Sequence, residues 1–178
     1  MARGDLTDAE WSLIGPCLPL GERGPIPDLR RQFNAAMWRF RTGSPWRDLP
    51  AEYGPWSTVY DRFRLWATTG TFEQLMQAMI DEAAARGQAD LDLVSVDSTT
   101  ARAHQHAAGM SLDPELVQVL EEIVKQEKGQ KPQSGDDAIN RIKEWRGLAF
   151  RFDKTPDSYL AGLHLRGAIL WIRSLQPL

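Results

Sequence analysis

The chain has 178 residues, 42% of them hydrophobic and 25% charged, which suits one ordinary packed domain or two small ones. Its net charge of −3 excludes a surface coated uniformly for nucleic acid, although local basic patches can still bind phosphates. The single Cys17 excludes a disulfide framework, and no apolar run approaches a membrane span, so we expect a cytoplasmic protein with no membrane association.

Helix signals begin close to the N-terminus. Thr7 and Glu10 predict a capping box, in which a hydroxyl and a carboxylate each satisfy a backbone N–H at a helix start. After that short helix, Pro27-Asp28 opens a second helix whose apolar residues recur at helical spacing and which Gly43 stops.

The next segment, residues 45–69, fits a helix-turn-helix motif. A short helical turn starts at Pro45, a tight turn follows, and Ser57 is the expected cap of a helix that ends at Gly70. The inner stripe of that helix is Val59 or Tyr60 with Phe63 and Trp66, and its other face is polar. Such a face can reach base edges in the major groove, but packed helices with solvated arginines share the pattern.

The pattern changes after a fourth amphipathic helix over 72–86. Residues 91–96 are β-branched and alternating, which predicts a strand that ends at Asp97. A carboxylate at a sheet rim can hold a hard cation, although such an Asp more often caps the next turn. His104 and His106 would share one strand face, but surface histidines explain them better because no third ligand is near.

The C-terminal part is again predicted to be helical. A helix starts at Asp113-Pro114, and two more are expected over about 136–145 and 158–175. Asp136 and Lys143 are seven residues apart, so two helical turns bring them to one face. There they could serve a metal and a phosphate, or remain solvated helix charges.

Basic residues are concentrated in two stretches. Residues 28–66 hold seven Arg against four acids, and residues 137–154 hold five basic residues against three acids. Between them, residues 111–130 are acidic, with five acids against two Lys. The two basic stretches are the candidates for phosphate contacts.

A series of motifs in order resembles the DDE transposases of bacterial insertion sequences, in the IS-four/IS-five group. The front-half motifs are TDAEW (7–11), WRFRTGSPWRDLP (38–50), YGPW (53–56), VYDRF (59–63) and VDSTTARAH (96–104). Those that resemble the C-terminal end of the family are NRIKEWRGLA (140–149), FDKT (152–155) and SYLAGLH (158–164). The resemblance covers residues 5–109 and 136–172.

The resemblance implies an RNase H-like core in which three carboxylates hold two Mg²⁺ ions for attack on a phosphodiester. It places the first carboxylate at Asp97 and the third at Asp136, with Lys143 as a DNA contact. Two departures stand out. Asp136 replaces the usual Glu, and no strand-like run between 98 and 135 ends in Asp, since Asp113 precedes a helix. We therefore expect Mg²⁺ not to be bound tightly.

We predict a mainly α fold in two parts: a helical DNA-binding domain over residues 1–88 with a helix-turn-helix-like motif, and an incomplete α/β RNase H-like core over 89–178. The predicted function is that of an insertion-sequence transposase remnant that binds terminal inverted repeats without cutting them, alone, as a homodimer or with a full-length transposase. The alternatives are a transposase completed between chains and a helix-turn-helix regulator. Besides Lys143, the predicted DNA contacts are Arg39, Arg41, Arg47, Thr58 and Arg62.

Overall fold

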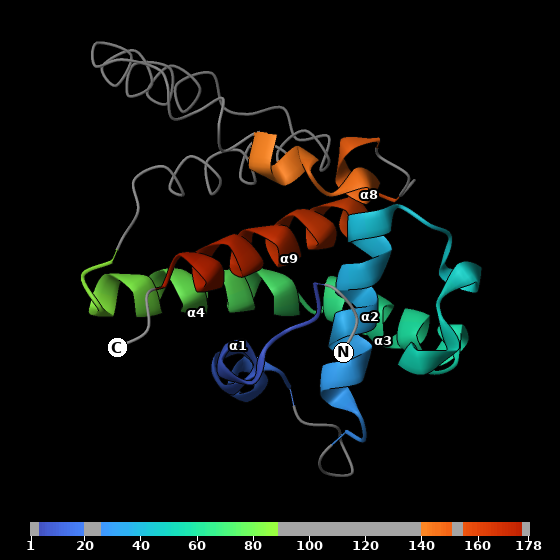
Figure 1. The fold of residues 1–178 in the computed structure, drawn as a ribbon, viewed down its shortest axis with the longest axis horizontal. Helices are drawn as coiled ribbons and strands as arrows, with labels where there is room; N and C mark the ends of the chain where they lie inside the picture. The colour runs from blue at the N-terminus through green and yellow to red at the C-terminus, as the bar shows by residue number, and fades with distance from the viewer. Residues whose placement is uncertain (1–3, 20–25, 89–139, 151–154, 176–178) are drawn as a thin grey trace.

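The computed structural model describes residues 4–19, 26–88, 140–150 and 155–175, which are mainly helical and contain no strand (Figure 1). The elements are α1 (Asp8–Ile14), η1 (Gly15–Cys17), α2 (Leu29–Thr42), η2 (Trp46–Asp48), η3 (Ala51–Tyr53), α3 (Trp56–Thr68), α4 (Thr71–Ala85), α8 (Arg146–Ala149) and α9 (Pro156–Ser174). The mainly helical class is thereby confirmed for these residues. The predicted strand over 91–96 lies outside them, so the RNase H-like part stays a prediction.

The signals at the ends of the first two helices are confirmed. The Thr7 hydroxyl accepts from the Glu10 N–H at 3.2 Å, and the Glu10 carboxylate accepts from the Thr7 N–H at 2.6 Å. The second helix, α2, ends at Gly43, whose φ of 72° lies in the left-handed region that favours glycine.

The segment before α3 contains one turn that was predicted and one that was not. The short helical turn expected at Pro45 is η2, which ends before Pro50, and a second 3-10 turn, η3, follows it. The expected cap at Ser57 is wrong: α3 begins at Trp56 with the extended Pro55 as its N-cap, so Ser57 lies inside the first turn and no side chain caps the helix. A helix-turn-helix is therefore not confirmed here.

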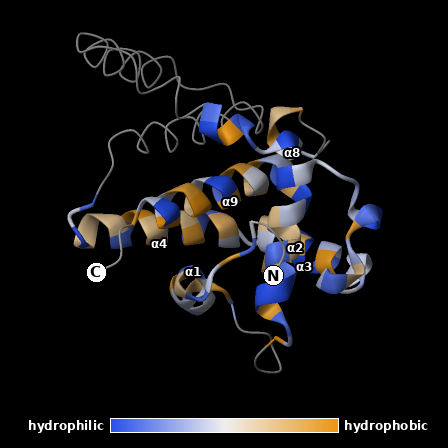
Figure 2. Ribbon diagram, viewed as in Figure 1, coloured by the Kyte–Doolittle hydropathy of each residue, from blue (hydrophilic) through white to orange (hydrophobic). Residues whose placement is uncertain are grey.

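The helices share one main hydrophobic core. Figure 1 shows α2 crossing the molecule, α9 lying alongside α4, and α8 packed against the end of α2. Buried residues of all these helices, and Leu6 from the N-terminal segment, belong to a single cluster. Hydrophobic residues are accordingly spread along α4 and α9 in Figure 2. Within the described ranges, no helix combines the length and apolar character needed to cross a membrane.

The C-terminal segments bury large apolar side chains. Ile142, Trp145, Leu163 and Trp171 are each at most 6% exposed. Their surroundings include α2, α3 and α4 of the N-terminal region, a partnership that the sequence did not predict. The division of the chain into domains at residues 88 and 89 remains a prediction.

Candidate nucleic-acid interface

Helix α3 has one buried face. Val59, Phe63 and Trp66 are at most 2% exposed. Phe63 and Trp66 enter the main hydrophobic core, as expected, and Val59 belongs to a smaller buried cluster with Leu49 and Tyr53. Phe63 packs against Phe72 of α4 with ring centres 5.7 Å apart. Of the two candidates for the remaining position, Val59 is fully buried, whereas Tyr60 is half-buried. This face fixes the rotation of α3 and decides which residues point outward.

The opposite face of α3 is exposed and mainly polar. It carries the polar residues Ser57, Thr58, Asp61, Arg64 and Thr68, together with Leu65, which is 49% exposed. Thr58 was predicted to belong to this face, and the structure places it there. Arg64 was missed, although the helical spacing of Ser57, Asp61, Arg64 and Thr68 would have revealed it.

The two arginines of α3 have different surroundings. Arg62 is half-buried, and its Nε donates to the Gln32 side-chain oxygen of α2 at 3.4 Å. Arg64 is exposed, and its guanidinium lies 5.9 Å from the centre of the Tyr60 ring. An arginine stacked on an aromatic ring keeps its N–H groups in the plane free for other acceptors. Arg64 is therefore better placed than Arg62 to meet a phosphate.

The start of α3 adds a second basic group. Arg47 of η2 is exposed, and its guanidinium lies 5.7 Å from the centre of the Trp56 ring, itself 39% exposed. No side chain caps α3, so the first-turn N–H groups at Trp56, Ser57 and Thr58 lie at an exposed helix start. Helix starts of this kind favour anions. The structure thus brings two predicted residues, Arg47 and Thr58, to one end of α3.

Two other predicted DNA contacts lie elsewhere. Arg39 is only 5% exposed, with its guanidinium 5.6 Å from the Phe40 ring centre and 5.7 Å from that of Trp46. This burial gives Arg39 a packing role and leaves little of it for a DNA contact. Arg41 is half-buried, and its guanidinium lies beside Gly4.

The remaining predicted site residues belong to the C-terminal half. Lys143 is exposed and lies in the helical turn before α8, not on the outer face of α3. Asp97 and Asp136, predicted as catalytic residues and Mg²⁺ ligands, fall outside the described residues. In the part of the chain that the structure describes, no three His, Cys, Asp or Glu side chains cluster as a metal site would require.

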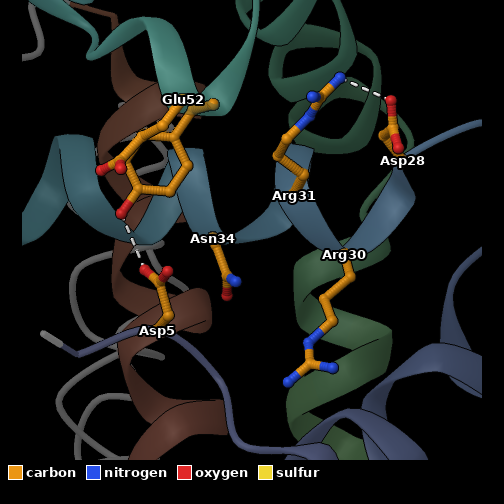
Figure 3. A pocket seen from close by; sticks show the side chains of 7 residues that line it. Asp5, Asp28, Arg30, Arg31, Asn34 and Glu52 are labelled. Carbon is orange, nitrogen blue, oxygen red and sulfur yellow. Dashed lines mark hydrogen bonds and ion pairs between the residues drawn. The ribbon is translucent and has the colours of Figure 1, made fainter. Parts of the chain in front are cut away.

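A polar pocket lies beside α2, on the side that faces the N-terminal segment and η3 (Figure 3). Its volume is about 360 Å³, and it is lined by Asp5, Asp28, Arg30, Arg31, Asn34, Glu52 and Tyr53. Several of these side chains bond to one another or to nearby residues: Arg31 pairs with Asp28, and the Tyr53 hydroxyl donates to Asp5 at 2.8 Å.

The polar side chains that line this pocket are engaged in bonds within the protein. Burial raises the pKa of Tyr53 well above its usual value, and the bond to Asp5 raises it further, so the phenol stays protonated. Arg30 pairs with Asp8 and also donates to the Leu6 carbonyl at 2.6 Å. These bonds hold the N-terminal segment against α2, so we assign the pocket a structural role. The functional candidate is the outer face of α3.

Comparison with known proteins connects this region to mobile DNA. A family model described as "Putative transposase of IS4/5 family" matches residues 6–76, which run from before α1 into α4. The uncharacterized protein y4sN of Sinorhizobium fredii is 36% identical over 107 residues, covering 58% of this chain and 81% of that protein. An uncharacterized 16.2 kDa protein of insertion element IS402 from Burkholderia cepacia is 33% identical over 113 residues, covering 58% of this chain and 76% of that protein. No solved structure matches the chain.

Proposed function

Because the chain belongs to the IS4/5 family of insertion-sequence transposase-related proteins, we propose that it binds DNA through the outer face of α3. The observation that carries this proposal is the division of α3 into two faces. Val59, Phe63 and Trp66 hold the helix in the core, and the polar residues opposite them are exposed. The matched region, residues 6–76, contains the whole of α3.

The chemistry of the exposed groups suits duplex DNA. The guanidinium groups of Arg47 and Arg64 can pair with phosphates or with the acceptor edge of guanine. The hydroxyls of Ser57 and Thr58 can donate to phosphates or base edges, and the Asp61 carboxylate can accept from cytosine. A helix with such a surface fits the width of the major groove.

The proposed role is binding without strand cleavage. Two-metal phosphoryl transfer needs carboxylates that hold both ions, and the family's third ligand is a Glu. This sequence offers Asp97 and Asp136 as ligands, and the side chain of Asp136 is one methylene shorter than the Glu of the family. No strand-like run between these two residues ends in an Asp that could be the remaining ligand. When bound, Mg²⁺ would supply the activation of the attacking oxygen, and these two carboxylates would be its ligands.

The binding proposal is tested with a fluorescent mixed-sequence DNA duplex, titrated with the full chain at several salt concentrations. We expect Arg64→Ala to weaken binding by about 1–3 kcal/mol and, where Arg64 contacts a phosphate, to lower the salt slope by about one. Arg86→Ala, which removes the same charge at the end of α4, should bind as the parent does. Absence of duplex binding, or an equal loss in both variants, would refute the proposal.

The proposed absence of cleavage needs a separate assay. The purified chain is incubated with Mg²⁺ or Mn²⁺ and a duplex that carries the terminal repeats of its own element. We expect no nicking and no strand transfer. Cleavage that Asp97→Ala abolishes would overturn this part of the proposal and support an active site completed between chains, because the single chain lacks a ligand.

A further inference from the structure

The helices before residue 89 present an apolar face that the C-terminal helix covers. Phe72, Leu75 and Met79 of α4 are at most 2% exposed, and α9 lies along this helix (Figure 1). On α9 itself, twelve consecutive residues from Ala161 to Ile172 are buried. A helix buried on all sides must be surrounded by the rest of the protein, so α9 is an internal element of this bundle.

Two glycines let the C-terminal helices approach α2 closely. A Cβ at Gly147 of α8 would lie 2.7 Å from the Phe40 carbonyl oxygen, and a Cβ at Gly162 of α9 would lie 2.4 Å from the Phe40 ring. Such distances are shorter than carbon atoms tolerate, so any larger residue would push the elements apart. Both glycines therefore contact the same residue of α2, Phe40. At this residue α8 and α9 pack closely against the N-terminal helices.

Polar contacts join the same two halves. Near the end of α9, the Arg173 Nε donates to the Glu10 carboxylate at 2.8 Å, and Glu10 is also part of the capping box of α1. Within the C-terminal half, the buried Arg166 donates to the Arg141 carbonyl and to Glu144, both at 2.6 Å. Arg166 thus bonds α9 to the residues before α8, and Arg173 bonds α9 to the start of α1.

We infer that the DNA-binding unit is discontinuous: residues 140–175 complete the helical domain that residues 4–88 begin, and residues 89–139 are an insertion within it. Helix α9 then acts as the support behind α3, because it contacts the inner side of α3 and leaves the outer side open. The family match ends at residue 76, so it assigns no role to this C-terminal segment. The packing contacts described above support the discontinuous unit as a structure. Its role in DNA binding rests on the proposed function.

The test cuts the full chain inside the inserted segment. A recognition sequence for a site-specific protease is placed after Gly109, and a second version carries it after Gly129, so that a local effect of one insertion is recognised. Each uncut protein is first required to show the helical circular dichroism and melting temperature of the parent. After cleavage, we expect the two fragments to coelute on size exclusion and to separate only in denaturant.

DNA titration of the cut protein supplies the functional readout. The nicked complex should bind the mixed-sequence duplex as tightly as the uncut chain. Fragments that separate or precipitate after the cut, in both versions, would overturn the inference. Fragments that stay together while neither the cut nor the uncut protein binds DNA would support the discontinuous unit and refute the proposed function.

Discussion

Helices α3 and α9 contribute to the same core but have opposite exposure. Along α9, every residue from Ala161 to Ile172 is buried, including the polar His164 and Arg166. In α3, only Val59, Phe63 and Trp66 are buried, and the face opposite them is open. Helix α9 is the longer of the two, with 19 residues against 13, but the contrast lies in the share of each helix that is buried.

This difference separates a supporting role from a binding role. A helix enclosed on all sides has no exposed surface for a partner, and close packing with its neighbours constrains the size and shape of its side chains. A helix with one open face can change that face at little cost to the core. Substitutions in α9 should therefore alter stability, whereas those on the outer face of α3 should alter binding.

The same truncation in the two helices should give the largest contrast. Leu165 of α9 is fully buried and Leu65 of α3 is 49% exposed. We expect Leu165→Ala to lower the free energy of unfolding by about 2–5 kcal/mol, because it removes buried methyl groups and leaves a cavity. The matched Leu65→Ala should cost under about 0.5 kcal/mol. Urea unfolding followed by circular dichroism measures both, and equal losses would erase the proposed distinction.

A smaller effect should come from the glycines that face Phe40. Gly147→Ala and Gly162→Ala should each cost about 1–3 kcal/mol, because a methyl group has no room at either position. Phe40→Leu should partly rescue Gly162→Ala, where the clash is with the ring. It should not rescue Gly147→Ala, where the clash is with the backbone oxygen. A double-mutant cycle measures this difference, and equal rescue of both variants would contradict the contact geometry.

Local rules predicted the parts of the fold that depend on neighbouring residues. The Thr7–Glu10 capping box and the stop at Gly43 involve backbone groups within one helical turn, so the sequence alone specifies them. The buried positions Phe63 and Trp66 followed from helical periodicity. The cap at Ser57 failed because Pro55 starts the helix earlier.

Long-range packing was beyond the same rules. The sequence predicted a helix over 158–175, but not that α4, α3, α2 and α8 would all pack against it and leave twelve consecutive residues buried. The burial of Arg39 was missed for a related reason: its guanidinium lies near the Phe40 and Trp46 rings, and Trp46 belongs to a separate element, η2. The choice between Arg62 and Arg64, in contrast, required only the rotation of α3, which its aromatic stripe already defines.

The smallest predicted effect concerns the ion pair that joins α9 to α1. Burial alone would raise the pKa of Glu10, but the bonds from the Thr7 N–H and from Arg173 to the ionised carboxylate outweigh it and lower that pKa. A carboxyl group with a lowered pKa in the folded state stabilises the fold above its unfolded pKa. That stability is lost as the pH falls through the folded value.

We therefore expect the melting temperature of the parent to fall as the pH is lowered from about 5 to about 3, with Glu10 contributing part of the fall. Glu10→Gln should melt lower than the parent at neutral pH and show a shallower fall over this range, because the neutral amide has no charge to lose. Arg173→Gln should reduce the slope by less, since it removes one partner of Glu10 and keeps the Thr7 bond. Differential scanning calorimetry across the range decides it: a Glu10→Gln profile parallel to that of the parent would show that this contact between α9 and α1 contributes nothing to the pH dependence.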